Sequence, residues 1–470
     1  MELVAKGLKL GGSLLVSLVL LSQGITSAQP TSPRSPLVNQ ARAAARITQR
    51  QEQLDRIQSH NFDLNRYPIT DANETHWRRT LWATALLEPQ ADYVEQALAY
   101  LLALAIQPNL TASQVRTVEM GLQIAHQLYT GQPESYAGLA AQFQTILLQS
   151  PQPRWVAMAL TSLATGSETL PIEQLKAQVI ERFPRWQYDV ALFTTLQELQ
   201  QQQQVQQAQL ADTEQLAQLP PLQDLLQWEV APDSAHLYVF CQPDRSQLCH
   251  AVLKDQTGQF VRDPLSDSQA LWSVPLSGRS LHNLPWHFRR GETPQGIFRM
   301  EGVIPQPDTE YFRAFGLFDL VQLFVPFEAG VKSFLPGQPG TFNQDVRAYQ
   351  ALLPPTWQTY FPMQESYWAG RLGRGLFRIH GTGEPTDFFA RNQRDQASNG
   401  WNPAIGCLVA VEQYDDLGRL QKADMPKILG QLRTASNQTL NGYMILVELP
   451  TELGDPIAAI TPLVENLGDF

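Results

Sequence analysis

The sequence predicts a multidomain α+β protein, in which an N-terminal all-α, helical-repeat-like region precedes a mainly β domain. Apolar residues recur at helical spacing through residues 41–209, in segments that Pro or Gly separates. From residue 231 onward, short β-branched and aromatic runs alternate with Gly and Pro turns, which is typical of strands. A chain of 470 residues is long enough for two or three domains with cores of their own.

Residues 1–28 have the pattern of a secretory signal peptide. Lys6 and Lys9 precede the apolar run SLLVSLVLL, and the small residues Thr26 and Ala28 suit a cleavage site. The apolar run is shorter than the ~20 residues that cross a bilayer, so an uncleaved anchor is the less favoured alternative. We therefore expect an exported protein of the periplasm or cell envelope, with no transmembrane segment in the mature chain.

The mature chain is predicted to begin with a disordered leader, residues 29–40, before the helical repeat-like domain. Within that domain, PRWVAMAL at Pro153 is echoed by PRWQYDVAL at Pro184, as stacked helix pairs would produce. One interpretation is a docking surface for a protein partner or the cell wall. The other, which we favour, is that the tryptophans fill helix cores.

A glutamine-rich run, QELQQQQQVQQAQ, ends the helical region and either continues its last helix or acts as a spacer. Residues 210–230 are predicted to be a Gln/Pro-containing linker, residues 231–450 the catalytic domain and residues 451–470 a C-terminal tail. The chain has a net charge of −11, and removing the signal peptide with its one glutamate and two lysines leaves −12. This charge argues against nucleic acid as a partner.

Three cysteines leave one thiol unpaired if the other two form a disulfide. Cys241 and Cys249 flank a turn-rich heptapeptide between two strand-like runs, as in a hairpin that brings two cysteines face to face, so we predict a structural disulfide between them. Cys407 is then the free thiol. The alternative is a metal site that includes His236 and His250, but the spacing matches no standard zinc pattern. We expect no metal and no cofactor.

Two glycine-flanked segments carry the candidate chemistry, LFRIHGTGEP at 376–385 and NPAIGCLVAVE at 402–412. An imidazole near a thiol accepts its proton and stabilises the thiolate, which is the reactive form of cysteine. Gly406 lets the backbone turn sharply enough to aim N–H groups at one point, as an oxyanion hole requires. An isolated histidine and cysteine are more often structural, but an unpaired thiol in an oxidising compartment favours a functional site at His380 and Cys407.

These segments, with RRGETPQGIFRMEG at 289–302 upstream, resemble the catalytic domain of the peptidoglycan L,D-transpeptidases, also called the YkuD-like domain. The family's motifs are a TPTGxF strand, an IHGT-type strand end and a serine-histidine-glycine-cysteine motif, and the similarity covers residues 231–450. The resemblance implies that Cys407 is the nucleophile and His380 the base, with the Gly381 carbonyl orienting the imidazole. It also implies that Gly406 and the Cys407 backbone N–H form the oxyanion hole.

Two positions depart from the family pattern. Ile405 stands where most members have histidine, and Val409 where they have arginine, so the chain is most similar to the divergent Ile-Gly-Cys (YafK-type) branch. Arg374 and Arg378 are candidate substitutes for the missing arginine in binding a substrate carboxylate, although solvated strand-flanking charges are the simpler interpretation.

The polar segment between the two motifs is expected to form a lid over the site. Within it, Ser398 and Asn402 are further candidates for substrate contact.

The resemblance implies an L,D-transpeptidase that forms a thioester with a peptidoglycan stem peptide and transfers it to an amine acceptor. Two alternatives stay open: a cell-wall peptide hydrolase with the same Cys/His site, and a non-catalytic wall-binding scaffold in which the helical region does the work.

Overall fold

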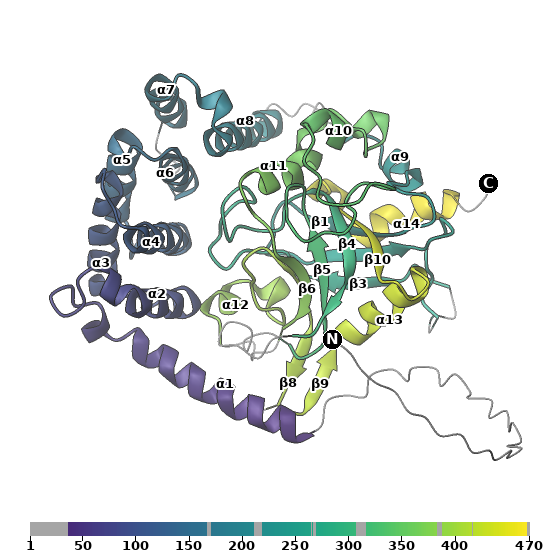
Figure 1. Ribbon diagram of the computed structural model, residues 1–470, viewed down its shortest axis with the longest axis horizontal. Coiled ribbons are helices and arrows are strands. Elements are labelled where there is room, and N and C mark those ends of the chain that lie inside the picture. The colour runs from purple at the N-terminus through teal and green to yellow at the C-terminus, as the bar shows by residue number, and fades with distance from the viewer. Residues whose placement is uncertain are drawn as a thin grey trace, which may run out of the picture.

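The computed structural model describes residues 36–166, 171–210, 219–264, 266, 269–306, 316–382, 388–415 and 417–467. The predicted signal peptide, the first residues of the leader and residues 211–218 of the linker lie outside this range. Among the described residues, no helix has the length and apolarity needed to span a membrane. The protein is mixed α/β, with helices in the N-terminal half and a large β-sheet in the C-terminal part (Figure 1).

Eight α-helices form the N-terminal region: α1 (Pro36–Arg56), α2 (Glu74–Leu87), α3 (Asp92–Ala103), α4 (Ala112–Gly131), α5 (Leu139–Gln149), α6 (Pro153–Gly166), α7 (Ile172–Arg182) and α8 (Val190–Leu210). Local capping defines some of their ends. Thr111 and Gln114 form a reciprocal capping box that starts α4, which satisfies two N–H groups that the helix leaves unpaired. The glutamine run continues α8 and is not a spacer as far as residue 210.

The helices stack in two layers around one side of the sheet domain (Figure 1). The inner layer contains α2, α4, α6 and α8, each packed on the next, and the outer layer contains α3, α5 and α7. This is the arrangement of paired helices in a short solenoid. Trp155 on α6 is buried in the core, as the interpretation of tryptophans as core residues predicted, whereas Trp186 is half-buried and packs against that core.

The C-terminal half is built on an eight-stranded mixed sheet with the order β3-β2-β1-β10-β4-β5-β6-β7. Its strands are β1 (Ala235–Cys241), β2 (Cys249–Lys254), β3 (Ser273–Leu276), β4 (Gly296–Ile304), β5 (Leu320–Phe324), β6 (Phe377–Gly381), β7 (Leu408–Ala410) and β10 (Asn441–Glu448). A separate two-stranded ribbon pairs β8 (Glu412–Tyr414) with β9 (Leu420–Ala423). Most neighbours are antiparallel, but β1 with β10 and β6 with β7 are parallel.

Helices cover both faces of the sheet: α9 (Leu222–Gln227), α10 (Val346–Gln350), α11 (Glu365–Arg371), α13 (Met425–Ala435) and α14 (Pro456–Leu467). A further helix, α12 (Ala390–Arg394), contacts α2 of the helical region. Strand β1 shows why both faces need cover. Leu237 and Val239 enter the core beneath α13, whereas Tyr238 and Phe240 enter the core shared with α9, α10, α11 and α14. Side chains alternate between the faces of a strand, so a strand that is apolar at every position is buried on both.

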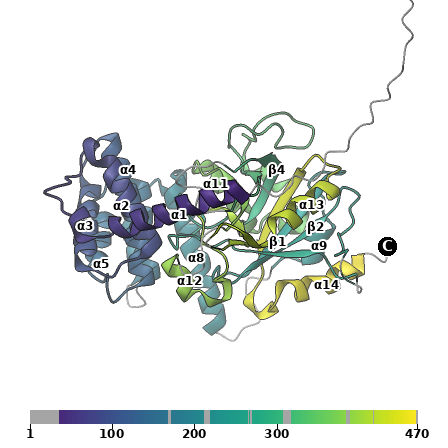
Figure 2. The same ribbon diagram turned by 90° about the horizontal axis from the view of Figure 1, so that it is seen from below.

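The two halves share a hydrophobic core. Leu281, Leu284, Phe288 and Phe389 belong to the sheet domain in sequence, but they are buried among the side chains of α2 to α8. Figure 2 shows the helical region beside the sheet domain, with α1 running from one toward the other. The helical region is therefore packed against the loops of the sheet domain and is not a separate appendage.

Three predicted boundaries differ from the structure. The leader, residues 29–40, was expected to be disordered, yet α1 begins at Pro36. The linker at 210–230 contains α9, and the tail at 451–470 contains α14, whose buried Ile460 and Val464 pack in the same core as α9. α9 and α14 pack on one face of the sheet and α1 packs on α2, and these tertiary contacts order the three segments.

Candidate functional site

Strands β6 and β7 bring His380 and Cys407 to the same face of neighbouring strands. The strands are parallel, with Ile379 opposite Leu408 and His380 opposite Val409, so Cys407 lies one residue before β7. Ile379 and Leu408 point into the core beneath α13. His380 and Cys407 are therefore on the other face, offset by one strand and two residues, which corresponds to ~8 Å between Cα atoms.

The His380 ring is held by its own strand end. Its Nδ1 lies 2.9 Å from the carbonyl oxygen of Gly381, the contact that the family resemblance implied for this glycine. The same oxygen accepts a hydrogen bond from the Gly316 N–H at 2.9 Å. A carbonyl can only accept, so Nδ1 carries the proton, and Nε2 is the basic nitrogen. Burial lowers the pKa of His380 to about 4, and the imidazole is neutral at pH 7.

The Cys407 thiol is partly exposed and donates to the backbone carbonyl of Leu376, with 3.8 Å between Sγ and O. Burial of Sγ raises the pKa of this thiol to about 11, against the lowering effects of the Arg378 charge and backbone N–H and of the Arg374 charge. The resting pair is therefore a neutral thiol beside a neutral imidazole. A base must remove the thiol proton before it can attack a substrate.

Gly406 occupies a backbone conformation that other residues rarely adopt, with φ of +123°. A Cβ at this position would lie 2.6 Å from Nη2 of Arg374 and 3.3 Å from the carbonyl oxygen of Gly291. The Gly406 carbonyl accepts a hydrogen bond from the Thr293 hydroxyl at 2.9 Å. The Thr-Pro segment before β4 is thus tied directly to the turn that presents the cysteine.

The two candidate arginines have different surroundings. Arg374 is buried and donates to the carbonyls of Gly291 at 2.8 Å and Glu292 at 2.9 Å, and also to the carbonyl of Trp286. It is neither a solvated charge nor accessible to a substrate carboxylate, and it braces the loop beneath Gly406. Arg378 is half-buried on β6, directly opposite the position of Cys407.

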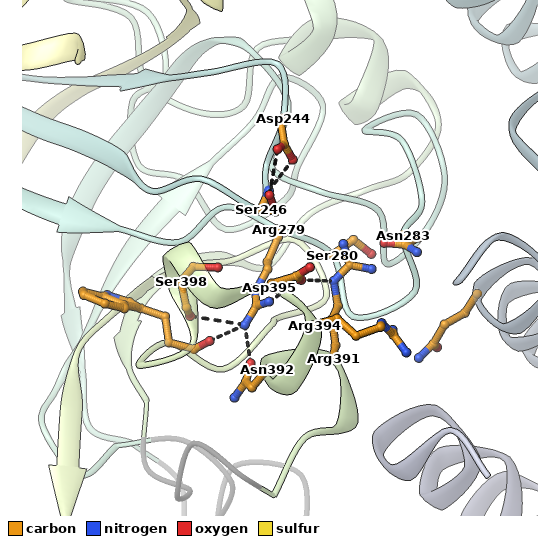
Figure 3. A network of polar contacts seen from close by, with 12 residues as sticks. Asp244, Ser246, Arg279, Ser280, Asn283, Arg391, Asn392, Arg394, Asp395 and Ser398 are labelled. Atoms are coloured by element: carbon orange, nitrogen blue, oxygen red, sulfur yellow. Dashed lines mark hydrogen bonds and ion pairs between the residues drawn. The ribbon is translucent and has the colours of Figure 1, made fainter. Parts of the chain in front are cut away.

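Ser398 and Asn402 are not presented to a substrate in this structure. Both are buried, and Asn402 accepts a hydrogen bond from Asn392 at 2.9 Å. They belong to a network around the buried Arg279, which binds Asp395, Asn392 and the carbonyls of Ser398 and Trp401 (Figure 3). Their side chains and carbonyls shape the segment that leads to Cys407.

The segment between the two motifs was expected to act as a lid, and residues 383–387 of it lie outside the described range. Its described part packs against the helical region. Arg394 on α12 forms an ion pair with Glu88, whose side chain is fully buried at the end of α2 and also accepts a hydrogen bond from Gln127. Phe389 enters the helical core. The helical region therefore holds this segment in place.

Sequence reasoning missed two features near the site. The buried Glu412 carboxyl packs against Gly381, where an added Cβ would clash with Oε2, and burial raises the pKa of Glu412 to about 7. Leu376, beside the thiol, has a φ of +62° and a side chain that is 71% exposed. Ile405, two residues before Cys407, is also exposed, at 40%, so apolar side chains are exposed on both segments beside the thiol. No local pattern marks a strained leucine before the structure is known.

The cysteines pair as predicted, with a disulfide between Cys241 and Cys249 and a free thiol at Cys407. His236 accepts a hydrogen bond from the Val230 N–H at 3.1 Å. In the described part of the chain, no group of three or more His, Cys, Asp or Glu side chains is arranged to hold a metal ion.

Comparisons with known proteins give no relative: no family model, curated protein or solved structure matches this chain.

Proposed function

We propose that this protein is an exported, cysteine-dependent L,D-transpeptidase acting on peptidoglycan stem peptides. The observation that carries the proposal is the parallel pairing of β6 with β7, because it puts a neutral imidazole with a defined tautomer beside the only free thiol among the three cysteines. The Gly-Cys turn, the Thr293 contact and the resemblance of these three segments to the family motifs support the same assignment.

In the proposed reaction, substrate binding turns the thiol from the Leu376 carbonyl toward Nε2 of His380, which takes the proton. The thiolate attacks the carbonyl carbon at the L-centre of the stem peptide, and the backbone N–H of Cys407 stabilises the tetrahedral oxyanion. The C–N bond then breaks, the imidazolium gives its proton to the leaving D-residue, and a thioester remains. An acceptor amine attacks this thioester, loses its proton to His380 and restores the thiol.

Arg378 is our candidate for the residue that binds the carboxylate of the departing D-residue. It is half-buried beside the nucleophile and donates to one backbone carbonyl, that of Phe377 at 2.8 Å, whereas the buried Arg374 donates to three. The position of the family arginine is taken by Val409, which is fully buried and offers no charge. An arginine that also lowers the thiol pKa would couple substrate binding to activation of the nucleophile.

The test is mass spectrometry of the mature protein incubated with disaccharide tetrapeptides, with and without an added D-amino acid. Wild-type protein should release or exchange the terminal D-residue, Cys407→Ala should be inactive and His380→Ala should be nearly so. The control His60→Ala removes an exposed histidine and should keep full activity. Exchange indicates a transpeptidase, and simple loss indicates a hydrolase. Turnover by Cys407→Ala would refute the assigned mechanism.

A non-catalytic, wall-binding protein is the second candidate, and the raised pKa of Cys407 favours it, because a thiol that stays protonated at neutral pH is a poor nucleophile. The two candidates differ in the fate of the thiol. A catalytic cysteine forms a thioester with the stem peptide, which intact-protein mass spectrometry detects as an added mass. A scaffold binds the same peptide and gains no mass.

A further inference from the structure

Two adjoining cavities lie where the helical region meets the sheet domain. One has a volume of about 270 Å³ and the other about 380 Å³, and Glu119, Gln123 and Arg289 line both. The walls come from α2, α4, α6 and α8 on one side and from the loop 287–290 and residues 372–373 on the other. We call the two together the interdomain groove.

The wall of the groove contains buried polar atoms that no other part of the described chain satisfies. His287 is 3% exposed, and neither of its ring nitrogens has a hydrogen-bond partner. The Nε1 of Trp155, also 3% exposed, and Nη1 of Arg290 have none either. Buried polar atoms without hydrogen-bond partners are unfavourable, so three such side chains around one space point to a ligand that supplies their partners.

The groove is more basic than the rest of the chain. Arg78, Arg116, Arg289 and Arg290 line the smaller cavity together with only two acids, Glu74 and Glu119. The two acids are already paired, Glu74 with Arg116 and Glu119 with Arg154, each at 2.6 Å. In a protein of net charge −11, this local excess of positive charge suits an anionic ligand.

The groove also has an apolar part and lies close to the candidate nucleophile. Trp155 and Phe288 line the larger cavity, whose edge is formed by Gly373. Gly373 is three residues from Leu376, the residue whose carbonyl faces the Cys407 thiol. Three residues of chain span at most ~11 Å, so a ligand in the groove lies next to the strand that carries the site.

We propose that the interdomain groove binds a carboxylate-bearing peptide of the substrate polymer, outside the reactive centre. Arg289 and Arg290 would bind carboxylates, His287 and Trp155 would pair with peptide amides, and the aromatic surface would contact the apolar side chains. This proposal rests on the proposed function for the identity of the polymer. It assigns the helical region a role in substrate recognition beside its structural one.

The test measures binding by calorimetry with the full mature protein carrying Cys407→Ala, so that no turnover occurs. The probes are a disaccharide tetrapeptide, the same compound with its carboxylates amidated, and inorganic phosphate. Arg289→Gln removes an exposed charge from the groove, and Ala191→Phe fills the larger cavity from α8. Arg347→Gln, an 85% exposed arginine on α10, is the matched control.

We expect the carboxylated probe to bind, and Arg289→Gln and Ala191→Phe each to weaken it about tenfold or more, while Arg347→Gln has no effect. Equal binding of the amidated probe, binding of phosphate alone, or unchanged affinity in both groove variants would overturn the proposal. Turnover by the Cys407-intact protein is measured separately. Groove-dependent binding without any turnover would refute the proposed function and support the groove as a binding site. Turnover with normal affinity in the groove variants would support the proposed function and refute the groove as a binding site.

Discussion

The ionisation of Cys407 gives the sharpest test of the site. Its pKa of about 11, against an ordinary value of 9.0, means about a hundred times less thiolate at neutral pH in the folded protein than in the unfolded chain. A more basic thiolate is also a better nucleophile, with a Brønsted coefficient of roughly 0.4–0.5, which recovers about tenfold. We therefore expect native Cys407 to react roughly ten times more slowly than the denatured chain at pH 7.

The assay is alkylation by iodoacetamide between pH 5 and pH 11, followed by intact-protein mass spectrometry. Because Cys241 and Cys249 form a disulfide, the reagent can alkylate only Cys407. The native rate should rise about tenfold per pH unit until about pH 11, whereas the rate of the denatured, unreduced chain should level off near pH 9.

Arg378 supplies an internal check, because its charge and backbone N–H lower the pKa of Cys407. Arg378→Gln should slow alkylation of the native protein further at every pH below 11, and Arg347→Gln, far out on an exposed helix, should not. A native rate that is already constant between about pH 5 and pH 8 would refute this reasoning, since it would mean that His380 and Cys407 form an imidazolium–thiolate pair at rest.

Three further predictions concern the surrounding structure. Gly406→Ala forces a side chain onto a φ of +123° and should lower the free energy of unfolding by ~1–3 kcal/mol in chemical denaturation, whereas Gly430→Ala, with open space around it on α13, should not. Replacing Cys241 and Cys249 together by serine should lower stability by ~2–4 kcal/mol, because the bridge restricts the unfolded chain, and should leave the reactivity of the Cys407 thiol intact. Glu412→Gln should become more stable relative to wild type as the pH rises from 4.5 to about 7, with a total change of ~3 kcal/mol.

The sign of the Glu412 prediction follows from its raised pKa. A carboxyl whose folded pKa lies above its unfolded value contributes its full stability below pH 4.5 and loses it as the pH rises through about 7. The glutamine variant does not titrate, so only the wild type changes. Parallel stability curves for the two proteins across this range would contradict the prediction. A thiol titration that counts three free thiols in the native wild type would contradict the disulfide prediction.

The helical region has a structural role that its own sequence does not suggest. Phe389 is buried in its core, and Glu88 forms an ion pair with Arg394. The loop 287–290 also lies against it, directly before Gly291, whose carbonyl accepts a hydrogen bond from Arg374. Removing residues 41–209 would expose this shared core, so we expect the sheet domain to need the helices for a correctly formed site.

Local patterns in the sequence determined much of this protein. Helical and strand periodicities predicted the helices before residue 210 and the strands after residue 231, because each depends on neighbouring residues along the chain. The spacing of Cys241 and Cys249 identified a hairpin disulfide, and the Gly-Cys pair marked a turn that only glycine tolerates. The pairing of His380 with the Gly381 carbonyl was expected from the family resemblance, and the structure has this contact.

Tertiary structure alone decided what depends on residues far apart. The register of β6 and β7 places Cys407 opposite Arg378. Arg374 was expected to be a surface charge, but it is buried beneath Gly406 and donates hydrogen bonds to backbone carbonyls such as that of Gly291. The sheet face orders α14, and the packing of helices on the loop 287–290 creates the interdomain groove. Burial, side-chain partners and shifted pKa values come from contacts between distant segments, which periodicity and spacing do not encode.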